Sequence, residues 1–505
     1  MQIGRRSFLG NGMALFGSAA AGALKAQATA KRHTERPRVR IGVIADPHIG
    51  TEWMMGINSP ATEKAFRDFR AQDVDAVAVL GDFTNSGTIA QMEEFARIWY
   101  EVFPDDMGLN GKKVEKLFVT GNHDPACWRP PEKQNPETHI APRIAEHWRR
   151  CFHEDYAPAW RKEINGFQFT GINWGIHPKK DIKDAYRRED LEPVFKEAFA
   201  RAKPGEPVFH IQHAPPPKTC YCSGASYGTA EQLFGGDERL FMLTGHLHKP
   251  LTHPKNIWQG SYTLVSAGVI TWASFPPFGW PKDLPGGAAY AKSQCTISVY
   301  QDEIVVERKS TWSGERLGDD WRIPLPLKRE TFPYTNERMT ARAKTPFFPP
   351  EATVAANVGM GENVFWKVPP NRKAVQGKGG IVLTFPAAAI DSGEDMVMCY
   401  EVTATRAGDG REVAKQRFFT EFFMGQRYMR NTYEVLFDAG KLTEGEPCRF
   451  AVRGRLLRQE KRAHSLGTDR VQAVHLTPAR RMAANELRAP PTDTPAPRFR
   501  RFIFM

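Results

Sequence analysis

Residues 39–48 read VRIGVIADPH, a run of aliphatic and β-branched residues that ends in the polar group Asp46-Pro47-His48. A short apolar run of this kind, followed by turn-forming residues, is typical of a buried β-strand. The same arrangement returns at residues 75–82, DAVAVLGD, and at residues 116–124, KLFVTGNHD. The sequence therefore predicts buried strands that each end in potential ligands.

Helical patterns separate these strands. Residues 60–70 carry a proline in the first turn, and Thr88 with Gln91 has the spacing of a capping box before an amphipathic run. Further strands are expected at residues 207–212 and 239–244. Strands that alternate with helices predict βαβ units and an α/β fold.

Five polar motifs follow predicted strands in the first half of the chain. In order, they are Asp46-Pro47-His48, Gly81-Asp82, Gly121-Asn122-His123-Asp124, His213-Ala214-Pro215 and Gly245-His246-Leu247-His248. Because α/β sheets bind ligands beyond the carboxyl ends of their strands, the motifs are expected to meet at one edge. Their carboxylates, amide and imidazoles suit Zn, Fe, Mn or Ni. The glycines would permit the tight turns that aim these side chains at one point.

This ordered set of motifs resembles the calcineurin-like metallophosphoesterase superfamily over roughly residues 38–310. The resemblance implies metallophosphoesterase-type layered sheets flanked by helices, and a dinuclear metal site in which Asp82 bridges the two ions. The other ligands of the first metal would be Asp46, His48 and His248. The other ligands of the second metal would be Asn122, His213 and His246.

The resemblance also implies the reaction. His123 would be the acid or charge stabiliser over the leaving group, oriented by Asp124. Two divalent or mixed-valence ions of Mn, Fe or Zn would supply a metal-bridged hydroxide that hydrolyses a phosphate ester. Monoester and diester substrates both stay open, because the shared motifs contact only the phosphoryl group. The alternative is a catalytically inactive binding protein of the cell envelope that keeps the fold.

Several residues near the motifs leave alternatives open. His210 competes with His213 as a ligand, and we prefer His213 because the family's ligand precedes an x-Pro pair. Asn85 and His177 are weaker candidates for substrate contact, and each could equally be an ordinary polar loop residue.

Two aromatic segments could border the site. Residues 125–165, rich in Trp, Pro and Arg, form either a wall or lid of the site or a surface helix. Residues 271–280, TWASFPPFGW, form either a second wall or an ordinary packing loop.

The N-terminus has the features of an export signal. Arg5 and Arg6 precede a weakly apolar stretch, and Ala26-Gln27-Ala28 offers a cleavage site of small residues. The arginine pair followed by Ser-Phe-Leu resembles a twin-arginine signal. We therefore expect residues 1–28 to engage the twin-arginine export machinery and the mature, periplasmic chain to hold no integral membrane segment.

Composition limits the remaining function classes. The chain has 505 residues, of which 41% are hydrophobic, and this is a globular composition with room for two or three domains. The net charge of +12 lies partly at the two ends, and no zinc-finger or RNA-binding signature accompanies it, so nucleic-acid binding is not expected. The seven cysteines leave at least one thiol unpaired, and we assign them no chemistry.

The chain divides into regions of different character. An α/β domain is expected over residues 38–312, and a proline-rich linker over residues 313–350. About seven short strands separated by turn-rich segments predict a smaller all-β sandwich-like domain, of immunoglobulin or fibronectin type, over residues 351–480. That region holds no acid–histidine cluster, so it would shape the site or bind a partner. Residues 481–505 form a basic tail.

Overall fold

The structure is a computed structural model. It describes residues 33–50, 58–175, 185–220, 232–233, 235–273, 291–359, 380–390, 395–425, 428–438, 442, 447–456 and 473–474. The expected signal (1–28), the tail (481–505) and His177 lie outside these residues. Among the helices that are described, none has the length and apolar character needed to cross a membrane.

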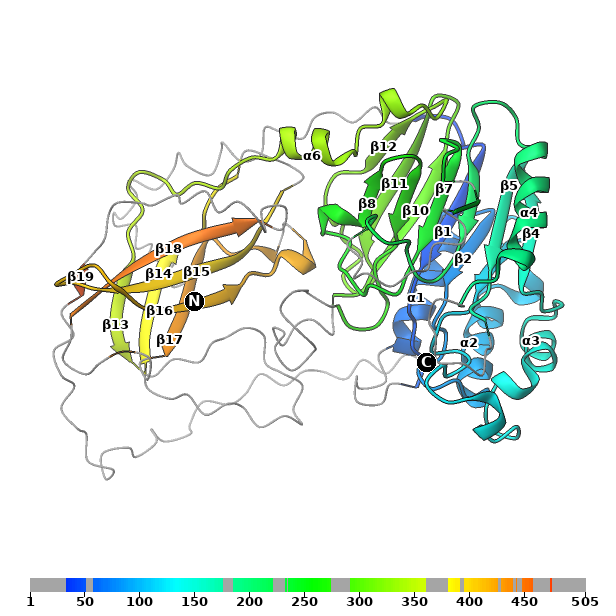
Figure 1. Ribbon diagram of the computed structural model, residues 1–505, viewed down its shortest axis with the longest axis horizontal. Coiled ribbons are helices and arrows are strands. Elements are labelled where there is room, and N and C mark those ends of the chain that lie inside the picture. The colour runs from blue at the N-terminus through cyan, green and yellow to red at the C-terminus, as the bar shows by residue number, and fades with distance from the viewer. Residues whose placement is uncertain are drawn as a thin grey trace, which may run out of the picture.

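Two bodies of β-sheet make up the described chain, and helices flank the larger one (Figure 1). The larger body begins with a six-stranded sheet in the order β12-β11-β10-β1-β2-β3. Its parallel strands are β1 (Val39–Ile44), β2 (Ala76–Leu80) and β3 (Glu115–Val119). Its antiparallel strands are β10 (Ser293–Val299), β11 (Glu303–Ser310) and β12 (Trp321–Pro324).

A second six-stranded sheet has the order β4-β5-β6-β7-β9-β8. These strands are β4 (Ala159–Ile164), β5 (Phe167–Ile172), β6 (Val208–Ile211), β7 (Leu240–Thr244), β8 (Ile257–Gln259) and β9 (Thr263–Ser266). The two sheets face each other across one apolar core, in which Val43 and Leu80 of the first sheet join Phe209 and Phe241 of the second. Each sheet is therefore buried on its inner face by the other sheet.

Helices cover the outer faces. On the first sheet lie α1 (Asn58–Ala71), α2 (Ile89–Val102) and α3 (Ile144–Phe152), with large apolar side chains such as Phe66, Trp99 and Phe152 packed on Val77 and Phe118. On the second sheet lies α4 (Arg188–Arg201). The layers run helix, sheet, sheet, helix, and the predicted layered α/β fold is confirmed.

Two local expectations need correction. Thr88 stands at the N-cap of α2 but makes no side-chain cap hydrogen bond. The side chain of Gln91 instead accepts a hydrogen bond from the backbone N–H of Ser86, so the capping box does not form. The first sheet also continues beyond residue 312, where we expected the domain to end, because β12 pairs with β11 and Trp321 enters the core between the sheets.

The smaller body consists of antiparallel strands. They are β13 (Ala355–Gly359), β14 (Gly380–Pro386), β15 (Val397–Arg406), β16 (Glu412–Phe419), β17 (Thr432–Asp438), β18 (Cys448–Leu456) and β19 (Ala473–Val474). A three-stranded sheet, β13-β14-β17, and a four-stranded sheet, β16-β15-β18-β19, share one apolar core. The strand expected at residues 363–368 lies outside the described residues.

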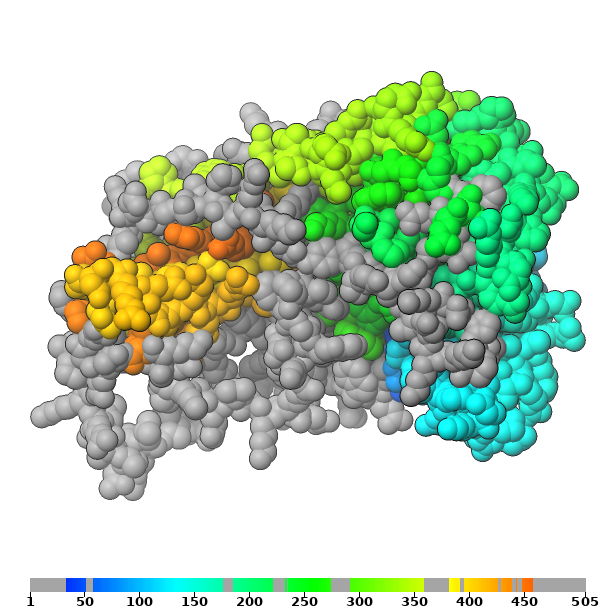
Figure 2. Space-filling model, in the orientation of Figure 1, coloured from blue at the N-terminus to red at the C-terminus, as the bar shows by residue number. Residues whose placement is uncertain are grey.

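An apolar cluster joins the two bodies. Met398 and Phe422 of the smaller body pack with Val269, Ala273 and Ala291 of the larger one, and we call this group the interdomain cluster. The chain between the bodies includes the short helix α6 (Asn336–Arg342), and the space-filling view shows this yellow-green stretch along the upper side of the molecule (Figure 2).

Candidate metal centre

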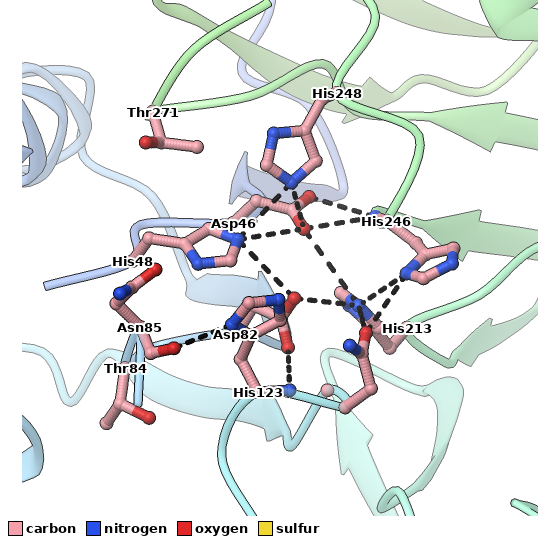
Figure 3. A network of polar contacts seen from close by, with 12 residues as sticks. Asp46, His48, Asp82, Thr84, Asn85, His123, His213, His246, His248 and Thr271 are labelled. Carbon is pink, nitrogen blue, oxygen red and sulfur yellow. Dashed lines mark hydrogen bonds and ion pairs between the residues drawn. The ribbon is translucent and has the colours of Figure 1, made fainter. Parts of the chain in front are cut away.

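The predicted ligands converge at the point where the two sheets meet (Figure 3). Asp46 and His48 follow β1, Asp82 follows β2, and Asn122 and His123 follow β3. From the facing sheet, His213 follows β6, and His246 and His248 follow β7. The carboxyl ends of parallel strands in two sheets therefore supply one site, as the motif order predicted.

One cluster contains Asp46, His48 and His248, all of which are buried. The Nε2 atoms of the two histidines lie 3.2 Å apart. The Nε2 atom of His248 lies 3.3 Å from Oδ1 of Asp46. These three side chains could hold one metal ion.

A second cluster contains Asp82, His213 and His246, with Asn122 beside it. The Nε2 atom of His213 lies 3.0 Å from Oδ1 of Asn122, 3.1 Å from Nδ1 of His246 and 3.2 Å from Oδ2 of Asp82. The same Oδ2 atom lies 3.4 Å from Nε2 of His48 in the first cluster. Asp82 therefore stands between the two clusters.

Backbone carbonyls set the orientation of two of the imidazoles. The Nδ1 atom of His213 lies 2.7 Å from the carbonyl oxygen of Leu80, and Nδ1 of His248 lies 3.1 Å from that of Trp272. Because a carbonyl oxygen only accepts hydrogen bonds, Nδ1 carries a proton and the Nε2 atom of each neutral ring offers its lone pair to the site. These lone pairs face carboxylate oxygens, so a proton or a metal ion has to lie between them, and the donor set fits a metal.

The pKa values of these side chains reflect two opposing effects, burial and the charges of neighbouring groups. Burial lowers the pKa of His48 to about 3 and that of His246 to about 4, so both rings are neutral at neutral pH and could bind a metal ion. Burial alone would raise the pKa of Asp82, but His213 and His48 outweigh it and hold that pKa below its usual value. Burial alone would lower the pKa of His213, but Asp82 outweighs it and raises the value to about 9. A metal ion at this position would take the place of that proton.

His123 lies at the edge of the two clusters and is only partly buried. Its Nδ1 atom is 2.7 Å from the carbonyl oxygen of Asn85, and its backbone N–H donates to Oδ1 of Asp82 at 2.8 Å. Its ring stands edge-on to that of His48, with the centroids 4.4 Å apart. The side chain is therefore held next to the predicted metal ligands while part of it faces solvent.

Residues 39–250 match the family model described as calcineurin-like phosphoesterase. This segment is a calcineurin-like phosphoesterase domain. The superfamily that the motifs resemble is thereby confirmed for this part of the chain. Among curated proteins, none matches the chain.

Several solved structures are similar to part of this chain. A dimetal phosphatase from Danio rerio has 13% identity and a TM-score of 0.38, and the alignment covers 57% of this chain and 99% of that one. A purple acid phosphatase from yellow lupin (Lupinus luteus) seeds has 11% identity and a TM-score of 0.36, with 57% and 53% covered. Vacuolar protein sorting 29 from Cryptosporidium parvum has 14% identity and a TM-score of 0.27, with 57% and 97% covered.

Five of the predicted ligands have an unusual backbone conformation. Positive φ angles, in the left-handed region, occur at Asp46 (54°), His48 (45°), Asp82 (55°), His246 (70°) and His248 (52°). A non-glycine residue in a sparsely populated backbone region costs about 1–3 kcal/mol, and such residues cluster at functional sites. The strain is supported by neighbouring loops: the backbone N–H of His48 donates to the carbonyl of Asp82 at 2.9 Å.

The motif glycines make room for the ligands. A Cβ atom on Gly81 would lie 2.6 Å from Nδ1 of His213, and one on Gly245 would lie 2.7 Å from Oδ2 of Asp46. A Cβ atom on Gly121 would lie 2.2 Å from Oδ1 of Asp82. We expected these glycines to serve tight turns, but among the three only Gly81 has a positive φ, 87°. At Gly121 and Gly245, glycine is needed because neighbouring atoms lie too close to leave room for a Cβ atom.

The expected link between Asp124 and His123 is not the one that the structure shows. The carboxylate of Asp124 is buried and accepts hydrogen bonds from the backbone N–H groups of Gly121 (2.7 Å), Asp82 (3.0 Å) and Thr84 (3.0 Å). Burial and the nearby Asp82 raise the pKa of Asp124 to about 7 despite these bonds. Asp124 therefore ties the loops after β2 and β3 together, and the carbonyl of Asn85 orients the His123 ring.

The structure separates His213 and His210, the two histidines considered for the same ligand position. His213 lies in the second cluster, as preferred. His210 lies within β6, where its Nδ1 atom is 3.0 Å from the hydroxyl oxygen of Thr170 and its Nε2 atom is 3.1 Å from Oε1 of Gln212. Both of its nitrogens are thus used inside the sheet.

The aromatic segments divide between the site and the core. Trp128 is 51% exposed, with its ring centroid 4.9 Å from that of His123, so it stands at the rim. In the same segment, Trp148 is buried on α3 in the helix-covered core, as the surface-helix alternative predicted. Trp272 belongs to the segment expected to form either a second wall or an ordinary packing loop, and it is buried against the rings of His48 and His248.

Proposed function

We propose that this chain hydrolyses a phosphate ester at a dinuclear metal centre. The observation that carries the proposal is the position of Asp82. Its Oδ2 atom lies 3.4 Å from Nε2 of His48 and 3.2 Å from Nε2 of His213. One carboxylate oxygen thus reaches an imidazole of each cluster, which is the arrangement that a ligand shared by two ions requires.

The donor set narrows the choice of metal. Imidazole nitrogens combined with carboxylate and amide oxygens suit Mn, Fe or Zn in divalent or mixed-valence form. When bound, two such ions would acidify a water molecule and neutralise charge on the phosphoryl oxygens. The buried Asp46 and Asp82 have pKa values below the usual range, so both carry the negative charge that two cations need.

His123 is placed to serve the leaving group. The carbonyl of Asn85 fixes its Nδ1 atom, so Nε2 is the atom left to face a substrate at the rim. A positioned general acid contributes about 10²–10⁴-fold to a rate. The exposed ring of Trp128 stands beside it and gives a departing group an apolar neighbour.

We propose export as the setting of this activity. Arg5-Arg6-Ser7-Phe8-Leu9 and the small residues Ala26-Gln27-Ala28 support a twin-arginine signal and a periplasmic mature protein. The phosphate ester would then be met outside the cytoplasm.

The test is metal analysis of the purified protein together with hydrolysis of an aryl phosphomonoester and the matching diester. We expect two ions per chain and turnover of at least one of the esters. Asp82→Ala should remove more than one ion, because the carboxylate serves both clusters, whereas His48→Ala should weaken mainly one. The matched control is His210→Ala, which removes an equally buried imidazole from β6 and should leave two ions.

The outcomes separate the candidate functions. A single metal in the wild type, or full occupancy in Asp82→Ala, would contradict the dinuclear assignment. Two ions without hydrolysis of either ester would favour the alternative, a metallophosphoesterase-fold binding protein of the cell envelope.

A further inference from the structure

A buried lysine, Lys292, is connected by hydrogen bonds to the segments that hold two of the predicted metal ligands. Lys292, directly before β10, is 1% exposed. Its ammonium donates hydrogen bonds to Oδ1 of Asn58 at 2.7 Å and to the carbonyl oxygens of Ile270 at 2.5 Å and Thr271 at 3.4 Å. Burial lowers the pKa of Lys292 to about 7, because the charged form loses its water, and the three oxygens replace part of that solvation.

One connection from this lysine reaches His48. Asn58 is the first residue of α1 and is buried. Since its Oδ1 atom faces the ammonium, its Nδ2 atom is turned to donate to the carbonyl of His48 at 3.2 Å and to the hydroxyl of Thr271 at 3.0 Å. The lysine thereby sets the direction of an amide that holds the strained backbone of His48.

Another connection reaches His248. The two carbonyls that Lys292 binds belong to residues 270 and 271, and the carbonyl of the next residue, Trp272, accepts the hydrogen bond from Nδ1 of His248. The Trp272 ring also lies 4.5 Å from the His248 ring and 5.1 Å from the His48 ring, between centroids. Thr271 stands on the side of the polar network where His48 and His248 lie (Figure 3).

We propose that Lys292 is a positioning residue for one half of the metal centre. Through Asn58 and residues 270–272 it sets the orientation of His48 and His248, which share the first cluster. The second cluster is supported from elsewhere, since the carbonyl of Leu80 orients His213. The inference rests on the proposed dinuclear function, and it predicts that removing the ammonium weakens one metal site selectively.

Residues of the smaller body pack beside the same segment, residues 270–272. Val269 and Ala273, which flank residues 270–272, and Ala291, which precedes Lys292, all belong to the interdomain cluster with Met398 and Phe422. The segment that supports His248 is therefore packed between the buried ammonium and the C-terminal sheets.

The test is calorimetric titration of metal-stripped full-length protein with Mn²⁺, comparing the wild type with Lys292→Met. Methionine keeps much of the length of lysine but donates no hydrogen bonds. One of the two dissociation constants should rise about 10–100-fold, which is the usual effect of losing a partner that orients a metal ligand, and the other should change less than about threefold.

Lys116→Met is the matched control. Lys116 is 2% exposed, and its ammonium pairs with Asp106 in the short turn after α2. The same substitution there should leave both dissociation constants unchanged. Equal changes in the two variants would mean that any buried lysine affects the site, and would overturn the proposal.

A second variant, Asn58→Ala, changes the residue that accepts the hydrogen bond from Lys292. Asn58→Ala leaves Lys292 in place and should weaken the same site. The double variant should lose less affinity than the sum of the two single losses, because the two residues share one hydrogen bond. Unchanged constants in Asn58→Ala, or equal weakening of both sites in Lys292→Met, would overturn the inference. Fewer than two ions bound by the wild type would instead contradict the proposed function itself.

Discussion

Substituting Gly121 by alanine would directly test whether the Asp82 carboxylate bridges two metal ions, as we propose. The added Cβ atom would lie 2.2 Å from Oδ1 of Asp82 and 2.7 Å from its backbone nitrogen. Non-bonded heavy atoms prefer separations of about 3.5 Å or more. The carboxylate or the strand end must therefore move by about 1 Å, a shift estimated from that contact range.

The size of the effect follows from what Asp82 touches. Its Oδ2 atom lies within 3.4 Å of an imidazole nitrogen in each cluster, so a displacement is felt at both sites. Overpacking of this kind costs about 1–3 kcal/mol of folding stability. Each kcal/mol corresponds to a melting temperature lower by about 2–4 °C in a domain of this size. We expect the affinity for both ions to fall about 10–100-fold, as when a supporting contact of a metal ligand is lost.

The assay combines thermal unfolding with elemental analysis at limiting metal. Gly236→Ala is the matched control, because a Cβ atom there meets no atom within 4 Å. It should change stability by no more than about 0.5 kcal/mol, as surface substitutions usually do, and should leave the metal content unchanged. If Gly121→Ala binds two ions as tightly as the wild type, the bridging position of Asp82 is refuted.

Three further predictions concern catalysis, folding and export. His123→Ala should keep both ions and lower turnover by about 10²–10⁴-fold, more for an alkoxide than for a nitrophenolate leaving group; loss of metal would make His123 a ligand, and an equal loss for both esters would exclude it as the acid. Asp124→Asn should lower stability by about 1–3 kcal/mol in thermal unfolding, because its amide would turn donors toward backbone N–H groups; lower turnover with unchanged stability would restore the direct role expected from sequence. Replacing Arg5 and Arg6 by lysine should leave precursor in the cytoplasm, since the receptor reads the arginine pair; normal periplasmic protein in cell fractions would contradict a twin-arginine signal.

The order of the motifs was enough to predict which side chains would meet. Each motif follows a buried strand, and strand ends are fixed by apolar runs such as residues 39–44, which are legible in the sequence. His213 is preferred to His210 because the family's ligand precedes an x-Pro pair, and the structure places His210 inside β6. The α/β character of the fold came from the same local signals, whereas the layered arrangement of the sheets came from the resemblance to the family.

The contacts that support the ligands could not be predicted in this way. Asn58 and Lys292 are 234 residues apart in the chain. They meet only because β10 pairs with β1 in the first sheet and α1 covers the outer face of that sheet. Nothing local shows that Asp124 would bind the backbone of Gly121 and Thr84 rather than His123. The absence of the capping box of α2 has a similar cause, because the side chain of Gln91 accepts a hydrogen bond from the backbone N–H of Ser86 in the preceding loop.

The left-handed backbone of the five ligands bears on how such a chain changes under mutation. Glycine or asparagine would relieve the backbone strain at each of these positions, which are Asp46, His48, Asp82, His246 and His248. Substitutions that remove the metal-binding side chains would therefore be favoured by folding stability alone. A protein that used this fold only as a binding surface would gain by giving up these side chains. This chain carries an aspartate or a histidine at all five positions and bears the associated cost in stability, which is the pattern expected where the selected property is the metal centre and not the scaffold.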